Sequence, residues 1–264
     1  MREYREHFVA FLDILGFKQL ITHSSCDEIY NIFETIHNNS SDKLIYNGVE
    51  IGAYQQIRHM ILSDSVILYI PSDIEDSFYA LITVCRKLQT TLANRENPIL
   101  LRGGIAKGNL YCDNGIIYGD GLTNAYLLES NLAKFPRIIF TGDTLEAGKR
   151  IAKYVVSDLE FRIEYILDDD MLYMIQIYPV FGRHSVNEIK GYFDGLIRLC
   201  NHYINISTDI SIREKYVWLR KKIDETIDLI PDIKVKYKAE QEKQMLQSFI
   251  ESNNREEKNM GEKE

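Results

Sequence analysis

The sequence predicts an α+β fold, in which a mostly antiparallel or mixed sheet is covered on one side by helices and is followed by C-terminal helices. The apolar pattern orders the first half of the chain as strand, helix, strand, strand, helix, strand, strand, helix, strand. Two of the strand pairs are joined by tight turns, which connect antiparallel neighbours. This order does not suit a doubly wound parallel sheet, where strands and helices alternate.

The first predicted elements are a buried strand over residues 7–14 and a helix over residues 16–38. The run HFVAFLDI is apolar, rich in residues that favour strands, and ends in an acid, Asp13. The segment that follows has helical spacing, with an interruption near residues 24–25. The strand therefore delivers a carboxylate to its end, directly before a turn.

A hairpin and a long helix are predicted next. Residues 53–70 contain two strand-like runs, AYQQIRHMIL and SVILYI, separated only by Ser63 and Asp64. This spacing predicts a hairpin with an acid at its tip. Ser72 and Glu75 then have the spacing of a capping box, and the apolar residues that follow repeat at helical intervals.

The following strand, ILLRGGIAKGNLYC, is interrupted by glycines, and a second tight turn at residues 113–115 leads into IIYG. Residues 121–133 again have helical spacing, and RIIFTG predicts another strand. Residues 159–180 contain strand-like stretches around three acids, Asp168 to Asp170, which are interpreted as a solvated turn.

The composition divides the chain into a domain at residues 1–180, an accessory helical region at 181–233 and a charged tail at 234–264. Apolar residues between positions 187 and 229, Trp218 among them, predict two helices. The tail is a highly charged helix that fades into a segment too polar to pack.

Charge and composition exclude several classes of function. The net charge of -8 opposes binding to a phosphate backbone over most of the surface, so a general nucleic-acid binder is disfavoured. The 4 cysteines and 6 histidines form no CxxC pair and no metal-ligand spacing. No apolar run approaches the ~18 residues of a membrane span. We therefore expect a soluble cytoplasmic protein.

Two aspartates are candidate metal ligands, because each lies at a strand end beside small residues. If the first strand and the hairpin are neighbours in one sheet, Asp13 and Asp64 can converge on a pair of Mg²⁺ or Mn²⁺ ions, which favour oxygen ligands. Taken without further context, acids at such positions are more often turn or capping residues.

The segment FLDILGF resembles the signature of class III adenylate and guanylate cyclases, in which an apolar strand precedes Asp, Ile, any residue, Gly and Phe. The resemblance implies that Asp13 binds two Mg²⁺ or Mn²⁺ ions and that the carbonyl of Ile14 contacts one of them. It also implies that the amides of Gly16 and Phe17 bind the triphosphate. Asp64 stands where the family has its second metal ligand, although a serine precedes it in place of the usual glycine.

Two further segments extend this resemblance. LRGGIAKG resembles the family's strand with Arg, one residue, Gly, Ile and a later Gly, which implies that Arg102 faces the phosphates. YGDGLTNAYLLE resembles the start of a helix that usually contains Gly, two residues, Val, Asn, two residues, Arg, Leu and Glu. Four elements in the family's order, over about residues 7–140, imply the ferredoxin-like fold of the class III cyclases.

The last of these segments departs from the family. Leu127 stands where the usual transition-state Arg would be, and the Asn is displaced by one to Asn124, with Thr123 in its place. One interpretation is that the register shifts and Asn124 acts. Another is that a different cation, such as Lys107 or Arg137, supplies the positive charge. The third is loss of activity.

Several strings, among them SDSVILYI and RGGIAKGNLY, resemble the stand-alone cyclases of the Pycsar antiphage systems more than adenylate cyclases. That resemblance implies conversion of UTP or CTP to cyclic UMP or cyclic CMP, and a separate effector that the cyclic nucleotide activates. It further implies a homodimer with two composite sites. An adenylate or guanylate cyclase, or an inactive cyclase-like module that binds a nucleotide or a partner, remains an alternative.

Base selection rests on two positions. Alignment of the hairpin places Arg58 where adenylate cyclases have an adenine-reading Lys, and Ile116 where they have an Asp that accepts from the adenine amino group. Isoleucine cannot accept a hydrogen bond, and Arg offers only donors, which match the O4 of uracil better than the N4 amine of cytosine. UTP is therefore favoured over CTP, although an exposed strand residue explains Arg58 equally well.

Overall fold

The structure is a computed structural model. It describes residues 2–40, 45–46, 49–50, 52–153, 165–177 and 184–239. Its strands are β1 (Arg5–Ile14), β2 (Ile45–Tyr46), β3 (Val49–Glu50), β4 (Arg58–Leu62), β5 (Ser65–Pro71), β6 (Leu101–Asp113), β7 (Ile116–Tyr118), β8 (Ile138–Phe140), β9 (Tyr165–Leu167) and β10 (Tyr173–Ile175). Its helices are α1 (Phe17–His23), α2 (Cys26–Ser40), the 3-10 helix η1 (Gly52–Gln56), α3 (Ser77–Ala93), α4 (Asp120–Leu132), α5 (Gly142–Arg150), α6 (Val186–Ile206) and α7 (Ile210–Asp228).

The main sheet has the strand order β4-β5-β1-β6-β8-β10-β9, with β7 paired to β6 outside this path. All of its pairs are antiparallel except β6 with β8. The predicted α+β fold with a mostly antiparallel sheet is therefore confirmed. Both tight turns are present, and each contains residues with positive φ: Ser63 at 55°, Asn114 at 48° and Gly115 at 79°.

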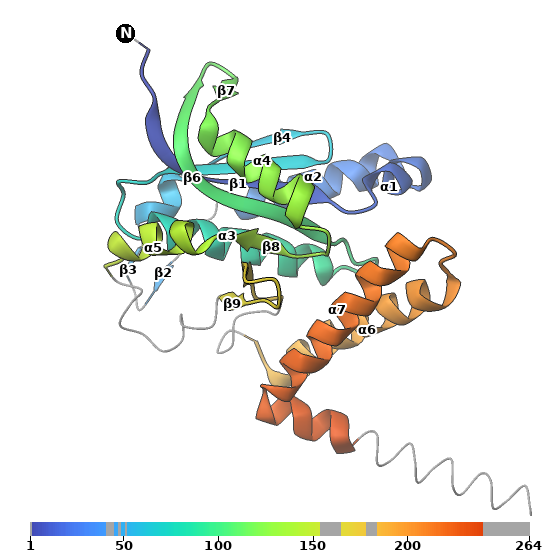
Figure 1. The fold of residues 1–264 in the computed structure, drawn as a ribbon. Coiled ribbons are helices and arrows are strands. Elements are labelled where there is room, and N and C mark those ends of the chain that lie inside the picture. Colours follow the sequence, from blue (N-terminus) through green and yellow to red (C-terminus); the bar gives the residue numbers. More distant parts are fainter. Residues whose placement is uncertain are drawn as a thin grey trace, which may run out of the picture.

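The two faces of the sheet carry different helices (Figure 1). Phe8, Ala10 and Leu12 of β1 point into the larger core, which they share with apolar residues of α2 and α3. The alternate residue Val9 points to the opposite face, where it packs in a cluster with Ala125 of α4. Helices cover one face as predicted, and α4 in addition covers part of the other.

Glycines on β6 allow α4 to lie close to the sheet. A Cβ atom at Gly104 would lie 2.5 Å from the Cβ of Leu128 and 2.9 Å from the backbone nitrogen of Glu129. A Cβ atom at Gly108 would lie 2.7 Å from the Cα of Gly121. These glycines therefore set how closely α4 packs against β6, and with it the positions of the side chains that α4 directs at the sheet.

The first hairpin strand is shorter than predicted. Residues 53–56 belong to η1 and not to the first hairpin strand, which begins at Arg58. The reason is that Ala53, Tyr54 and Ile57 are all buried in one core, and a helical turn, unlike a strand, can direct neighbouring residues to the same side.

The break in the first helix is confirmed, because Glu28 accepts hydrogen bonds from the amide and hydroxyl of Ser25.

The predicted capping box at Ser72 and Glu75 is also wrong, because α3 begins only at Ser77. Tertiary hydrogen bonds hold the preceding residues in turns. The amide of Ser72 donates to the carbonyl of Glu6, and Asp76 donates its amide to the carbonyl of Ile151. A local capping pattern is thus overridden by contacts with segments distant in the sequence.

The two predicted accessory helices are confirmed as α6 and α7, which form an antiparallel pair (Figure 1). Their apolar faces share a second core with Leu100, Ile139 and Met174 of the sheet region. Residues 231–239 are helical, and the rest of the charged tail lies outside the described residues. The domain boundaries at 180 and 233 stay predictions. Among the described helices, none is both long and apolar enough to cross a membrane.

The prediction of a solvated acidic turn is wrong for Asp168, whose side chain is 2% exposed. It forms ion pairs with Arg137 and with Lys222 of α7, the latter at 2.9 Å. Arg137 also pairs with Asp170, whereas Asp169 is exposed. Asp168 can be buried because two cations from distant segments compensate its charge.

Candidate functional site

The two predicted metal ligands lie next to each other at one end of the sheet. Asp13 is the last but one residue of β1, where it faces Ser65 of β5 and Arg102 of β6. Asp64 occupies the turn before β5, and its carbonyl accepts a hydrogen bond from the amide of Ile14 at 3.0 Å. The β1–β5 register therefore brings the end of one strand against the tip of the hairpin.

Arg102 links Asp13 to an acid of α4. Its Nε donates a 2.8 Å hydrogen bond to Oδ2 of Asp13, and its Nη2 lies 2.8 Å from Oε1 of Glu129. The side chains of Asp13, Arg102 and Glu129 are 17%, 26% and 4% exposed. Since Gly104 seats α4 on β6, Glu129 is held beside the guanidinium and leaves Arg102 little freedom at that end.

The cluster carries more negative than positive charge. Burial raises the pKa of Asp13, Arg102 counters this with a hydrogen bond and its charge, and the charge of Asp64 raises the pKa further. Burial also raises the pKa of Glu129, Arg102 lowers it, and both aspartates raise it. Three acids around one Arg therefore leave an excess of negative charge that an added cation would relieve.

The donor set fits hard divalent cations. Among the described residues, neither Oδ1 of Asp13 nor the carboxylate of Asp64 takes part in a hydrogen bond, so both can coordinate a metal. Within the part of the chain that the structure describes, no three His, Cys, Asp or Glu side chains group as metal ligands. A metal here would thus depend on two carboxylates, with backbone and substrate oxygens completing its shell, as Mg²⁺ commonly does.

The turn between β1 and α1 comes directly after the metal-ligand candidate Asp13 in the chain. Gly16 has a φ of 75° and precedes the first residue of α1, Phe17, whose buried ring contacts Phe33 at a centroid distance of 5.8 Å. A Cβ atom at Gly16 would meet nothing within 4 Å, so the residue is required for its backbone conformation and not for space. Phe17 anchors the turn in the core, and the first amides of α1 are left without intrahelical acceptors.

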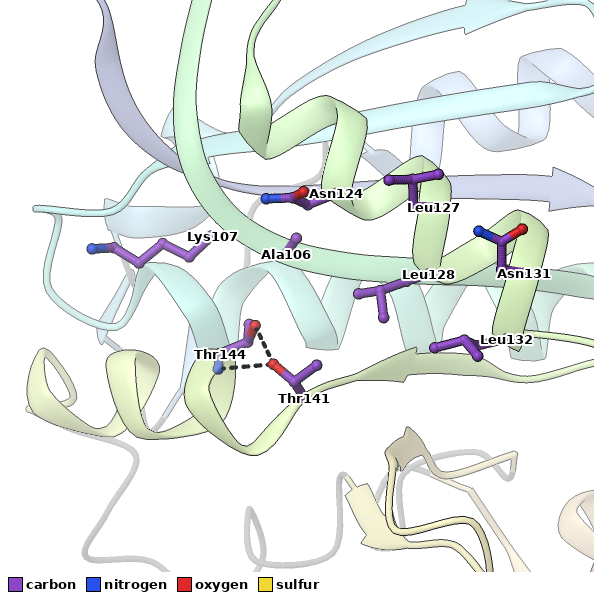
Figure 2. A pocket seen from close by; sticks show the side chains of 9 residues that line it. All are labelled: Ala106, Lys107, Asn124, Leu127, Leu128, Asn131, Leu132, Thr141 and Thr144. Atoms are coloured by element: carbon purple, nitrogen blue, oxygen red, sulfur yellow. Dashed lines mark hydrogen bonds between the residues drawn. The ribbon is translucent and has the colours of Figure 1, made fainter.

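A separate cavity of about 470 Å³ lies beside α4 and is lined by β6 and the start of α5 (Figure 2). Asn124, Leu127 and Asn131 line it from one face of α4, and Thr141 and Thr144 line it from the start of α5. The remaining lining residues are Ala106, Lys107, Leu128 and Leu132.

The helix geometry separates the two candidate polar residues of α4. Asn124 faces this cavity, whereas Thr123 is not among its lining residues. The hydroxyl of Thr123 donates to the carbonyl of Gly119 at 3.1 Å, one turn back in the same helix. Of these two side chains, only Asn124 lines the cavity together with Leu127.

The two cations that the sequence suggested lie in different surroundings. Lys107 lines the cavity and pairs with Glu6 at 2.8 Å on the surface. Arg137 is buried and pairs with Asp168 and Asp170, which hold its pKa above the usual value although burial alone would lower it. Only Lys107 therefore shares a surface with Asn124.

Arg58 and Ile116 occupy exposed strands. Arg58 faces Tyr69 at the end of β4 away from the hairpin tip, and its Nη1 donates to the carbonyls of Gln55 and Ile57. Ile116 is 58% exposed at the start of β7. The local backbone contacts orient Arg58 without using all of its donors.

Sequence reasoning did not assign a role to Glu129, which the structure places in the acidic cluster. The sequence does contain a signal that Glu129 is buried, because Gly121 and Ala125 precede it at intervals of four and both lie on the buried face of α4. An acid that continues such a buried face requires a cation beneath it.

No protein-family model matches the chain. No curated protein matches it either. Among solved structures, the guanylyl cyclase domain of the RhoGC fusion protein from the aquatic fungus Blastocladiella emersonii has 14% identity and a TM-score of 0.46, over 65% of this chain and 95% of that one. The guanylyl cyclase Cya2 has 10% identity and a TM-score of 0.45, over 70% and 98%. An adenylate/guanylate cyclase/hydrolase from Silicibacter pomeroyi has 17% identity and a TM-score of 0.41, over 66% and 96%. Similarities at these identities and TM-scores do not support a conclusion about function.

Proposed function

We propose that this chain is a nucleotide cyclase of the class III type, which converts UTP or CTP to the 3′,5′-cyclic mononucleotide and diphosphate. The observation that carries the proposal is the meeting of Asp13 and Asp64 at one sheet end, with Arg102 between Asp13 and Glu129. The site is rich in acids, has unpaired carboxylate oxygens, and lies beside a turn with free amides. These features suit a triphosphate that arrives with divalent cations.

Ring closure requires the ribose 3′-oxygen to attack the α-phosphorus in line with the departing diphosphate. Mg²⁺ or Mn²⁺ bound by Asp13, Asp64 and the carbonyl of Ile14 would lower the pKa of the 3′-hydroxyl and spread the phosphate charge. Arg102 can exchange its contact with Asp13 for a phosphate oxygen, while Glu129 holds the other end of the guanidinium. The amides of Gly16 and the following residue orient the triphosphate.

A homodimer with composite sites is part of the proposal. The lining of the α4 cavity includes neither Asp13 nor Asp64, so Asn124 does not share a pocket with the two aspartates of its own chain. The helix α4 and the strand β7 that precedes it also expose apolar side chains, among them Tyr126, Leu127, Leu132 and Tyr118. Exposed apolar groups near one another mark protein interfaces. A second copy would cover them and bring its own acids toward Asn124.

Lys107 is the cation that we expect to replace the missing Arg. Its surface pair with Glu6 is worth about 0–1 kcal/mol, so a phosphate can displace it. Lys107→Gln should lower kcat about a hundredfold, the scale for losing one preorganised charge-stabilising donor. Glu6→Gln, which frees Lys107, should leave kcat within about twofold. Steady-state rates of both variants test this, and wild-type kcat in Lys107→Gln would exclude the assignment.

Pyrimidine selection rests on Arg58 and Ile116. Ile116 offers no acceptor to the adenine amino group, and Arg58 retains donors for a carbonyl oxygen. UTP is the favoured substrate on this ground, and CTP is the second. In the organism, a cyclic pyrimidine nucleotide would act as an antiphage second messenger on a separate effector protein, as the sequence resemblance to the Pycsar cyclases implies.

Incubation of the purified protein with each of the four nucleoside triphosphates and Mn²⁺ tests the function. We expect cyclic UMP as the main product, with less cyclic CMP and little cyclic AMP or GMP, measured by chromatography and mass spectrometry. Purine products alone would show an adenylate or guanylate cyclase. No cyclic product, together with Mn²⁺-dependent nucleotide binding, would favour the second candidate, an inactive cyclase-like module, for which Leu127 at the Arg position is the supporting observation.

A further inference from the structure

A second cavity, of about 420 Å³, is lined by the connection from α3 to β6 and by one face of α6. Its lining includes neither Asp13 nor Asp64, and it shares no residue with the cavity beside α4. Its volume lies in the range of small-molecule sites, about 300–1,000 Å³. A bare inorganic ion would leave most of this space unfilled, because a water molecule takes up only about 30 Å³.

The connection between α3 and β6 forms a preformed wall of this cavity. The amide of Asn94 donates to the carbonyl of Thr90 at 3.0 Å, and the amide of Ile99 donates to the carbonyl of Leu92 at 3.0 Å. The side chain of Ile99 is buried in the larger core. Residues 94–98 are therefore anchored at both ends, to α3 and to the core, and a ligand would meet a wall that is already in place.

Two glycines of α6 line the cavity, and close packing does not explain them. Among the described residues, a Cβ atom at Gly191 would meet nothing within 4 Å, and one at Gly195 would meet only Nη2 of Arg198, at 3.9 Å. Neither glycine has a positive φ. Gly104, in contrast, is needed for the approach of α4, since a Cβ there would lie 2.5 Å from Leu128. Glycine destabilises a helix interior relative to alanine, so this pair weakens α6 and keeps the cavity open.

The charged groups of the lining favour an anion. Arg95, Arg198 and the titratable His202 line the cavity, and Glu96 is the acid among its lining residues. The guanidinium of Arg198 forms no hydrogen bond or ion pair with another described residue. Arg95 donates to the hydroxyl of Thr35 at 3.5 Å, which leaves most of its five N–H groups available. Two arginines from separate segments thus have donors to spare at one cavity.

We propose that this cavity binds an organic phosphate about the size of a nucleoside monophosphate, with Arg198 of α6 and Arg95 of the α3–β6 connection holding the phosphate. Guanidinium groups match phosphate oxygens with paired donors, and a terminal phosphate has three oxygens to share between two arginines. The organic part occupies the space over Gly191 and Gly195, beside Leu199. This site goes beyond the proposed cyclase activity and does not depend on it.

Calorimetric titration with 5′-UMP in the presence of EDTA tests the proposal, because the candidate metal site takes no part without divalent cations. Arg198→Gln should weaken binding about tenfold or more, the scale for losing one charge-assisted hydrogen bond. Gly195→Leu, which places a side chain in the cavity, should abolish binding. Arg213→Gln makes the same charge change at an exposed position of α7 and should bind as wild type. Asp13→Asn should also bind as wild type.

Two further measurements control for folding and for the phosphate. Gly195→Ala should raise the melting temperature, because it removes a glycine from a helix interior, and this shows that position 195 tolerates a side chain. Uridine, which lacks the phosphate, should bind at least tenfold more weakly than 5′-UMP.

Several results would overturn this inference. Equal affinity of 5′-UMP for wild type, Arg198→Gln and Gly195→Leu would exclude the cavity, as would loss of binding in Asp13→Asn alone. Absence of binding by wild type, with 5′-UMP and with ribose 5-phosphate, would also exclude it. Inorganic phosphate that binds as tightly as 5′-UMP would exclude a role for the organic part. Turnover of UTP with Mn²⁺ is measured separately, so failure of this site and failure of the proposed function are distinguishable.

Discussion

Asp13→Asn is expected to lower the rate of cyclic nucleotide formation by about 10³-fold or more while the protein stays folded. The carboxylate supplies charge that divalent cations require, and metal stabilisation of the reacting phosphate is worth several kcal/mol, about 1.36 kcal/mol per tenfold. The neutral amide keeps an oxygen that can accept the hydrogen bond from Arg102. Initial rates with saturating UTP and Mn²⁺ measure the effect, and circular dichroism checks the fold.

The stability of the Asp13→Asn variant follows from the direction of the pKa shift. Burial raises the pKa of Asp13, which means that the ionised group is less favourable in the folded chain than in the unfolded one. A neutral residue therefore removes no net stabilisation at neutral pH. Asp232→Asn, an exposed acid near the C-terminal end of the described chain, is the matched control. Unchanged turnover in Asp13→Asn would show that the metal assignment is wrong.

Asp168→Asn is expected to lower the free energy of unfolding by about 3–5 kcal/mol, because it leaves the buried cations Arg137 and Lys222 without their shared partner. Urea unfolding followed by circular dichroism measures this. Asp169→Asn is the control at the adjacent position, where the side chain is 80% exposed and its ion pair with Lys221 lies in solvent. Equal unfolding free energies in the two variants would contradict the structural role of Asp168.

The same ion pairs predict a dependence on pH. Burial raises the pKa of Asp168, but hydrogen bonds from Lys222 and from the Asp169 amide, with the charge of Arg137, hold it below the usual value. Its stabilisation is therefore complete above the ordinary aspartate pKa of about 3.9 and is lost as the pH falls below it. The stability of Asp168→Asn should fall less steeply than that of wild type between about pH 5 and pH 2.

Much of the site could be predicted from residues close together in the sequence. The strand that ends in Asp13 and the hairpin that carries Asp64 follow from apolar alternation and from a two-residue turn. Antiparallel pairing of those strands then brings the two acids together, as the register of β1 with β5 shows. The capping box at Ser72 failed because its residues bond to Glu6 and Ile151, which a local pattern does not contain.

By itself the sequence determined the order of the elements, the two tight turns, the acids at the strand ends and the pair of accessory helices, because turn chemistry and apolar periodicity act over a few neighbouring residues. The tertiary structure alone decided which charges meet. Arg137 is committed to Asp168, and Glu129 reaches Arg102 because Gly104 lets α4 approach. Electrostatic partners depend on distance in space, and sequence separation carries no information about it.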